Sequence, residues 1–407
     1  MSSKIKIAVI LDQVISVGGG FQQAMNNVNT LLDMSSEKYQ FIFFSVVKQD
    51  NNLVKPLLIN PNFLEKISLF LRRFFLDKKL YKFLKLIRYF QKYNYFEKAL
   101  IENNIDLVYF LSSNVLANDL EELNYIITVW DLAHLEHPEF PEVRFNREFE
   151  KRNNALKKVL PKATSIIVDS EMGRENVSNF FNIKKEKIHI LNFSPASHLD
   201  GNTKKRSKAE SDTIKKYNFN RPYIFYPAQF WSHKNHIYIL EGLKILEKKY
   251  RINFSAIFTG TDKGNLGFVK EKTKSLKLAK RIVFPGFVSD SELRQYYIHS
   301  FALVMPTFFG PTNLPPLEAF KLGVPVLYPD LPGLRDQVGG AAILLDLSDP
   351  ESLAKNLKLL YEDKNFKRNL IESGKKRLVE INHLNRQETL LLIFDNFALK
   401  LKTWKSP

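Results

Sequence analysis

The feature that most constrains this fold is an alternation of short apolar runs with amphipathic stretches, which occurs twice along the chain. Short runs such as Ile5–Asp12 and Leu107–Leu111, often β-branched, are typical of buried strands. The stretches between such runs have the spacing of helices that are apolar on one face. The alternation predicts parallel sheets covered by helices on both faces.

The pattern stops near Asn192 and restarts at Tyr223. Between these points, Ser197–Asp212 contains almost no apolar residue and is typical of an exposed linker. We therefore predict an α/β protein with two doubly wound, Rossmann-like domains, residues 1–200 and 201–385, that face each other across a cleft. A length of 407 residues agrees with this division, because single cores seldom serve more than about 250–300 residues. Residues 386–407 are predicted to form a further amphipathic helix, which could pack on either domain, including back on the N-terminal one.

The expected elements follow the same pattern in both halves. In the first half we predict strands at Ile5–Asp12, Phe41–Val47, Leu107–Leu111, Ile126–Asp131, Ser165–Asp169 and Ile188–Asn192. In the second half we predict strands at Tyr223–Tyr226, Phe254–Phe258, Arg281–Phe284, Ala302–Met305, Val324–Tyr328 and Ala341–Leu345, with one long helix at Glu351–Glu380.

The charge of the chain favours anionic partners. The formal net charge is +17, and Lys and Arg interleave with Phe, Leu and Tyr in Phe63–Lys98. This composition is that of a basic amphipathic helix that could lie on an anionic membrane surface, or equally of a helix with an apolar face towards the core. No nucleic-acid-binding motif accompanies the charge, so a nucleic-acid partner is not expected.

The cellular location is constrained by what the composition lacks. There is no cysteine, which excludes disulfides and thiolate metal sites and suits a reducing cytoplasm. No run of about 18 apolar residues suggests a transmembrane helix, and Ile5–Leu11 resembles a first buried strand more than a signal peptide. We expect a cytoplasmic protein, at most peripheral on the inner face of the membrane.

Ligands of open α/β sheets bind at the carboxyl ends of the strands, so the loops after the strands carry the candidate chemistry. Gly18, Gly19 and Gly20 follow the first predicted strand and open a helix. Glycines let a backbone approach a ligand, and a helix N-terminus favours phosphate. We predict that Gly19 and Gly20 contact a phosphate-bearing ligand. The alternative is that the glycines serve only to form a tight turn.

A second loop follows the strand that ends near Thr128. It carries Asp131, His134, Glu136 and His137 within a few residues, a density of polar groups that could orient sugar hydroxyls or transfer a proton. We predict catalytic roles for Asp131 and His134. The alternative is an acidic loop with a capping Asp and solvated histidines.

A third loop, at the end of the first strand of the second half, contains Gln229 and Lys234. A lysine just before a helix opposes the helix dipole, so a structural role alone explains it poorly. Its ammonium could instead neutralise a departing diphosphate. Lys234 is our main catalytic candidate.

The fourth loop has the strongest signal and runs from Gly310 to a helix that opens near Pro315. Amides at Thr312, Asn313 and Leu314 could hold a diphosphate at the helix N-terminus. Glu318, one turn further on, could accept hydrogen bonds from both ribose hydroxyls. The alternative for Glu318 is a carboxylate that simply favours the helix dipole.

Together these motifs resemble the retaining glycosyltransferases of family 4, which have the GT-B fold. The resemblance is carried by Lys234, the turn ending at Gly260, Pro285–Val288 and, above all, Leu314–Glu318 with Gly323–Val326. It covers the second half of the chain and, more loosely, loops of the first half at Val168–Glu171 and Ile190–Asn192.

The resemblance implies a UDP-, GDP- or dTDP-sugar donor bound mainly by the second domain, and a glycan or lipid-linked glycan acceptor on the first. The base would lie near Phe287 and Val288, the ribose on Glu318, and the diphosphate on Lys234 and the amides after Pro311. It also implies retention of anomeric configuration, no metal and no cofactor, because the nucleotide-sugar is itself the substrate.

Three positions depart from the family pattern. The usual carboxylate eight residues before Glu318 is Gly310, the usual arginine five residues before Lys234 is Gln229, and the usual histidine before Asp131 is Trp130. We expect His134 to substitute for that histidine and Gln229 to remain near the donor. Together with the basic aromatic stretch, the departures keep open a degenerate, membrane-associated scaffold or carbohydrate-binding subunit. A further alternative keeps the fold but changes the reaction to that of a nucleotide-sugar epimerase.

Overall fold

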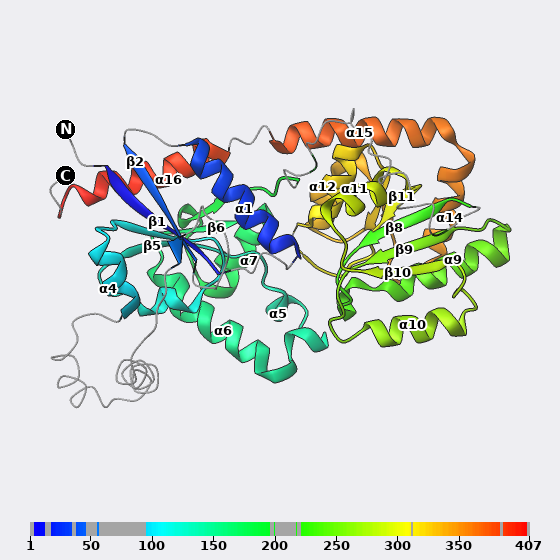
Figure 1. Cartoon of the computed structure of the whole chain (residues 1–407), viewed down its shortest axis with the longest axis horizontal. Helices are drawn as coiled ribbons and strands as arrows, with labels where there is room; N and C mark the ends of the chain where they lie inside the picture. Colours follow the sequence, from blue (N-terminus) through cyan, green and yellow to red (C-terminus); the bar gives the residue numbers. More distant parts are fainter. Residues whose placement is uncertain are drawn as a thin grey trace.

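The first domain of the computed structural model is a parallel seven-stranded sheet with helices on both sides (Figure 1). The structure describes residues 4–12, 18–34, 38–45, 55–56, 95–195, 199, 217, 221–310, 312–382 and 386–404. The strand order is β3-β2-β1-β4-β5-β6-β7. The strands are β1 (Ile5–Leu11), β2 (Tyr39–Ser45), β3 (Lys55–Pro56), β4 (Leu107–Phe110), β5 (Asn124–Thr128), β6 (Ser165–Val168) and β7 (Ile188–Ile190). The helices are α1 (Gly18–Asp33), α4 (Tyr95–Glu102), α5 (Ala133–Glu136), α6 (Glu148–Val159) and α7 (Glu171–Phe181).

The second domain repeats this design with a six-stranded parallel sheet in the order β10-β9-β8-β11-β12-β13. Its strands are β8 (Tyr223–Pro227), β9 (Ser255–Thr259), β10 (Ile282–Gly286), β11 (Ala302–Val304), β12 (Val326–Pro329) and β13 (Ile343–Leu345). Its helices are α9 (His236–Tyr250), α10 (Leu266–Ser275), α11 (Asp290–Ile298), α12 (Leu314–Leu322), α13 (Leu334–Val338), α14 (Pro350–Glu362) and α15 (Lys364–Asn382).

The predicted fold class, two Rossmann-like domains of the GT-B kind, is confirmed. The central strands are apolar on both faces, as the continuous hydrophobic runs predicted: Ile7 to Leu11 of β1 are all buried. In each sheet the strand order reverses beside its first strand, between β1 and β4 and between β8 and β11. The loops beside such a reversal form the usual ligand crevice.

The last helix, α16 (Arg386–Leu401), returns to the first domain and lies beside α1 (Figure 1). Its residues Leu390, Ile393 and Phe394 are buried in the same apolar cluster as Ile7 and Val9 of β1. The chain therefore crosses between the domains twice, once after β7 and once before α16.

Two helical features differ from the sequence-based expectation. The single helix predicted over Glu351–Glu380 is wrong: it is α14 and α15, separated at Asp363, whose backbone is extended (φ −103°, ψ 95°). The Asp363 carboxylate accepts from the amide of Phe366 at 2.8 Å, so it caps the second helix. Helix α6 was not predicted, because Leu156 and Val159 are its only buried residues and leave little apolar periodicity.

Phe63–Lys98, the proposed membrane-binding segment, lies almost entirely outside the described residues. Only Tyr95–Lys98 are described, at the start of α4, where Phe96 and Glu97 are buried. Among the described helices none is both long and apolar enough to cross a membrane.

Candidate functional site

Lys234 lies at the crevice of the second domain, in a 3₁₀ turn (Ser232–Lys234) between β8 and α9. Asn235 adopts a left-handed conformation (φ 53°, ψ 44°) and its side chain caps α9. The hydroxyl of Tyr226, from β8, donates to the Lys234 carbonyl at 2.9 Å. The strand before the lysine and the helix after it thus both fix its position.

The ammonium of Lys234 lies beside neutral oxygens. Its Nζ is 3.4 Å from Thr307 Oγ1 and 3.3 Å from Asn313 Oδ1. No carboxylate of the described residues approaches this Nζ within the 4.0 Å of an ion pair. Burial lowers the pKa of Lys234 to about 8, although Asp131 and Glu142 across the cleft partly oppose this effect. The geometry is that of a cation whose charge is not fully compensated by the protein.

Asn313 is held by a buried polar network. Its backbone N–H donates to Gln337 Oε1 (3.0 Å), and its backbone carbonyl accepts from Gln337 Nε2 (2.6 Å). Its side-chain Nδ2 donates to the Tyr328 hydroxyl (2.7 Å). These contacts orient the remaining side-chain oxygen of Asn313 towards Lys234. The loop before α12 is therefore fixed by local partners from β12 and α13.

The N-terminus of α12 offers fewer free backbone N–H groups than the sequence predicted. The N–H of Asn313 is occupied by Gln337, and Pro315 and Pro316 have no N–H. Thr312 directs its hydroxyl to the carboxylate of Asp169 in the first domain. Leu314 keeps an N–H at the first helical position. The prediction of a row of free amides at Thr312–Leu314 is thus wrong for Asn313.

Glu318 is buried one turn into α12. Its Oε2 accepts from the hydroxyl of Tyr297 in α11 at 2.8 Å. Burial raises the pKa of Glu318 to about 7, and the hydrogen bond from Tyr297 only partly offsets that effect. Further hydroxyl donors would therefore stabilise the charged form.

Phe287 and Val288 form the loop between β10 and α11. Phe287 is 64% exposed, which is unusual for a large apolar side chain, whereas Val288 packs partly against the domain core. An exposed aromatic ring beside the crevice can stack on a planar ligand.

Gln229 and Gly260 meet at the ends of β8 and β9. The Trp231 indole N–H donates to Gln229 Oε1 at 2.9 Å, so the amide of Gln229 is held on the tryptophan. Gly260 has φ +138°, and a Cβ there would lie 2.3 Å from the Ala228 carbonyl oxygen. Gly260 is required by this close approach of two backbones.

Gly310 also has a conformation that favours glycine, with φ +117°. A Cβ at this position would lie 3.0 Å from the side chain of Asn313. The loop conformation that positions Asn313 therefore favours glycine at residue 310, where the family usually has a carboxylate.

On the first domain, Asp131 is paired with Arg152 of α6. Arg152 Nη2 lies 2.5 Å from Asp131 Oδ1, which also accepts from the amide of Ala133 at 3.0 Å. Burial opposes ionisation of Asp131, but Arg152 outweighs burial and holds the pKa of the carboxyl below its ordinary value. Asp131 thus stays ionised and acts on Lys234 and His233 through its field.

His134 does not reach the cleft. Its side chain is fully buried, and its ring packs edge-on against Phe149 with 5.7 Å between the ring centroids. Neither ring nitrogen has a hydrogen-bond partner among the residues that the structure describes. Burial lowers the pKa of His134 to about 4, so the ring is neutral. The structure does not support the predicted catalytic role of His134 or its substitution for the missing histidine.

Gly19 and Gly20 lie in the first turn of α1. A Cβ on Gly20 would lie 2.5 Å from the Trp130 ring, so this glycine makes room for the indole. The ring of Trp130 therefore rests against the turn that was predicted to contact the donor. This packing explains Gly20 without a donor, and no described contact assigns Gly19 a partner.

Glu142 joins the two domains beside Lys234. Its carboxylate accepts from the backbone N–H of His233 (3.0 Å) and lies 2.5 Å from the ring Nδ1. Burial lowers the pKa of His233 to about 4, so a neutral ring donates to a charged carboxylate. The His233 ring also stacks on Phe309 at 3.8 Å, and Phe140 packs against both rings.

Asp169 makes the second polar contact between the domains. It ends β6, and its side chain accepts from the hydroxyls of Thr312 and Ser170. Burial raises the pKa of Asp169 to about 7, with the two hydroxyls opposing this effect. Nearby, Gly333 leaves room for Met172: a Cβ there would lie 2.4 Å from the sulfur.

The residues at the cleft that sequence reasoning missed are Arg152, Glu142 and Phe309. Arg152 lies 21 positions after its partner, in the unpredicted helix α6. Glu142 lies shortly after the second candidate loop and Phe309 directly before the fourth, and only the packing of one domain on the other gives them partners. Lys234 and Asn313 lie within hydrogen-bonding distance of each other, whereas Thr312 contacts Asp169.

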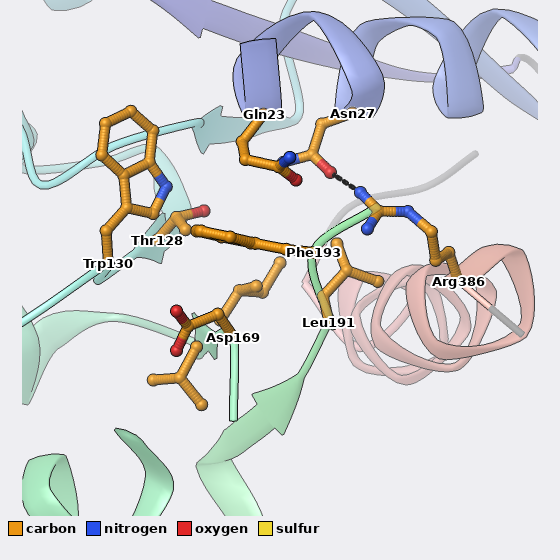
Figure 2. Close-up of a pocket in the computed structure, with 10 residues that line it drawn as sticks. Gln23, Asn27, Thr128, Trp130, Asp169, Leu191, Phe193 and Arg386 are labelled. Carbon is orange, nitrogen blue, oxygen red and sulfur yellow. Dashed lines mark hydrogen bonds between the residues drawn. The ribbon is translucent and has the colours of Figure 1, made fainter. Parts of the chain in front are cut away.

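A small pocket lies in the first domain next to this cleft (Figure 2). It is bounded by the ends of β5, β6 and β7, by α1 and by the first residue of α16. Its lining residues are Gln23, Asn27, Thr128, Trp130, Ile167, Val168, Asp169, Leu191, Phe193 and Arg386. Within the described ranges no three His, Asp or Glu side chains cluster closely enough to hold a metal ion.

The chain is similar in sequence to known glycosyltransferases. Residues 208–377 match the family model "Glycosyl transferases group 1". The O-antigen chain mannosyltransferase B of Escherichia coli is 24% identical over 264 residues, which cover 64% of this chain and 67% of that protein. The O-antigen chain mannosyltransferase RfbU of Salmonella typhimurium is 23% identical over 58% of this chain and 60% of its own length.

The fold also has close structural relatives. The crystal structure of Anabaena Alr3699/HepE in complex with UDP and glucose superposes on 98% of this chain and 100% of its own, with a TM-score of 0.64 and 12% identity. At this identity the likeness establishes the fold alone.

Proposed function

We propose that the protein transfers a hexose or deoxyhexose from a nucleotide-sugar to a glycan or lipid-linked glycan of the bacterial surface. The proposal is supported by the match of residues 208–377 to the group 1 glycosyltransferase model and by the GT-B fold of the chain. Mannose is the first sugar to test, since two relatives are O-antigen chain mannosyltransferases. UDP, GDP or dTDP would be the product.

The observation that carries this proposal is the under-compensated ammonium of Lys234. Its nearest polar atoms are the neutral oxygens of Thr307 and Asn313, in the crevice where α/β sheets bind ligands. A diphosphate would supply the missing negative charge and would raise the lowered pKa of the lysine. Glu318 would accept the ribose hydroxyls beside Tyr297, and exposed Phe287 would stack on the base.

The proposed reaction replaces one bond to the anomeric carbon by another. The bond from that carbon to the diphosphate oxygen breaks, and the acceptor oxygen bonds to the same face of the sugar, so configuration is retained. The proton of the acceptor hydroxyl leaves with the nucleoside diphosphate. Lys234 stabilises the charge that develops on the diphosphate oxygen, a role that needs no metal.

The scaffold alternative has less support than catalysis. A degenerate protein would have no reason to keep Lys234 desolvated in the crevice with Asn313 aimed at it. The Gly310 departure is explained by loop conformation, and Gln229 is held by Trp231.

The test is to measure transfer from GDP-mannose and other nucleotide-sugars by the wild-type chain and by Lys234→Ala. Loss of the ammonium should lower kcat/KM by about 10²-fold or more, because one group that stabilises the transition state is removed. Lys244→Ala is the matched control, since Lys244 is also partly buried in this domain but already pairs with Glu247. Equal rates in wild type and Lys234→Ala would refute the proposal.

A further inference from the structure

Lys234 lies at the end of a turn whose first N–H groups need an acceptor. Residues Ser232–Lys234 form a single 3₁₀ turn, and the side chain of Trp231 before it makes no capping hydrogen bond. The first N–H groups of a helical turn have no acceptor within the turn itself. A Ser, Thr, Asp or Asn just before the turn usually supplies one. The indole of Trp231 has no acceptor atom, so the cap must come from elsewhere in the chain.

The cap comes from the first domain. The carboxylate of Glu142 accepts from the backbone N–H of His233 at 3.0 Å and lies 2.5 Å from the ring Nδ1 of the same residue. Glu142 is 91 positions earlier in the chain, in a short 3₁₀ turn, Pro141–Val143. One carboxylate thus binds both the backbone and the side chain of the residue directly before Lys234.

This contact is shielded from water. The side chains of Glu142 and His233 are each 8% exposed. The His233 ring stacks on Phe309 with 3.8 Å between the ring centroids, and Phe309 also stacks on His137 of the first domain at 5.5 Å. In such surroundings a hydrogen bond to a charged group is stronger than at the surface, and an N–H left without its acceptor is costly.

The other anchors of the turn hold different groups. The Tyr226 hydroxyl donates to the carbonyl of Lys234, and the N–H of Phe308 donates to the carbonyl of His233 at 2.9 Å. Both anchors belong to the second domain, and both leave the His233 N–H to Glu142. Among the ion pairs of the described residues none joins Glu142 to the Lys234 ammonium. Glu142 therefore acts on the lysine mainly through the backbone of the turn.

We propose that Glu142 is a positioning residue for Lys234, which the first domain supplies and which caps the Lys234 turn only while the two domains are in contact. The second domain alone holds the carbonyl side of the turn, and the contact between the domains completes its N–H side. This inference rests on the proposed function. It adds a residue of the first domain to a diphosphate site otherwise built from the second.

The first test follows the turn itself, by hydrogen–deuterium exchange of the His233 N–H in the full chain. Glu142→Ala should speed its exchange about 10-fold, as expected for the loss of a hydrogen bond to a charged group. Glu142→Gln keeps an acceptor oxygen without the charge and should speed it about 3-fold, which keeps the test decisive if Glu142→Ala does not fold. Unchanged exchange in these variants would overturn the inference, whatever the activity of the chain.

Glu139→Ala is the matched control for both tests. Glu139 belongs to the same segment and also pairs with a histidine, His137, but its side chain is 64% exposed and does not contact the turn. Its loss should change neither the exchange of the His233 N–H nor the rate of transfer. An equal effect of Glu139→Ala and Glu142→Ala would count against a specific role for Glu142.

The second test asks whether Glu142 acts through Lys234, from kcat/KM for GDP-mannose. Glu142→Ala should lower kcat/KM about 10-fold and Glu142→Gln about 3-fold, a partial rescue by the retained acceptor oxygen. In a Lys234→Ala background, Glu142→Ala should cost less than about 2-fold, because the group that it positions is gone. The same cost in both backgrounds would overturn the positioning role.

The two tests also separate this inference from the proposed function. If Lys234→Ala lowers kcat/KM and Glu142→Ala does not, the inference fails and the proposed function stands. If the wild-type chain transfers no sugar while Glu142→Ala still speeds exchange of the His233 N–H, the proposed function fails and the capping of the turn by Glu142 stands.

Discussion

The two sides of the cleft are built in different ways. On the second domain, Lys234, Asn313 and Glu318 are positioned by partners from their own sheet and its helices, such as Gln337, Tyr328 and Tyr297. On the first domain, the corresponding surface is assembled from α1, β5, β6, β7 and α16, which span nearly the whole chain. The second-domain side of the cleft is a local construction, and the first-domain side depends on long-range assembly.

The largest expected effect distinguishes backbone packing on the second-domain side from side-chain packing on the first-domain side. Gly260→Ala places a Cβ against the backbone of Ala228 at a positive φ, and should lower the free energy of unfolding by about 3 kcal/mol or more. Gly20→Ala meets only the ring of Trp130, which can shift, so the loss should be about 1 kcal/mol. Urea denaturation followed by circular dichroism measures both, and equal losses would contradict the distinction.

An intermediate effect tests how far the second-domain side depends on its own polar network. Asn313→Ala removes the side-chain Nδ2 that donates to the Tyr328 hydroxyl but keeps the backbone groups that bond Gln337, and should lower the free energy of unfolding by about 1–2 kcal/mol. Nucleotide affinity should fall with it, because the side-chain oxygen beside Lys234 is also lost. The exposed Asn103→Ala serves as control. An unchanged nucleotide affinity would contradict a role of this network in positioning Lys234.

The smallest effect is a pH dependence of nucleotide affinity on the second-domain side. Only protonated Lys234 attracts a diphosphate, and its pKa in the free protein is about 8. Nucleotide affinity should therefore be full near pH 7 and fall about 10-fold by pH 9, which corresponds to ~1.4 kcal/mol. Asp131 and Glu142 face this lysine and favour its charged form.

Calorimetric titrations of nucleotide across pH 6–9 measure this slope, with Lys234→Met as the pH-insensitive reference. A nucleotide affinity that stays level or rises between pH 7 and pH 9 would contradict the assignment.

The same contrast explains what could be predicted from the sequence. Strand–loop–helix units have a local signature, so the fold, both sheets and the position of Lys234 before α9 followed from apolar runs and loop composition. Glu318 was recognisable because it lies one turn after a proline-rich helix start. These predictions needed no knowledge of how one domain packs on the other.

Other features depend on packing that no local pattern records. His134 stands among acidic and aromatic residues that indicate a polar loop, yet one turn of α5 directs it against Phe149. The backbone N–H of Asn313 was expected to be free, but it donates to the side chain of Gln337, which lies 24 positions further along the chain. Arg386 begins a helix that could have packed on either domain, and only the structure brings it to Asn27.

The return of α16 to the first domain has a consequence for biosynthesis. During translation the first domain emerges before the second, but part of its apolar core, including Phe394 and Phe397, is made only after α15. The apolar cluster that α16 shares with α1 and β1 therefore stays incomplete until the second domain has been synthesised. Domains usually complete folding in the order of their synthesis; here the domain that begins first is completed last.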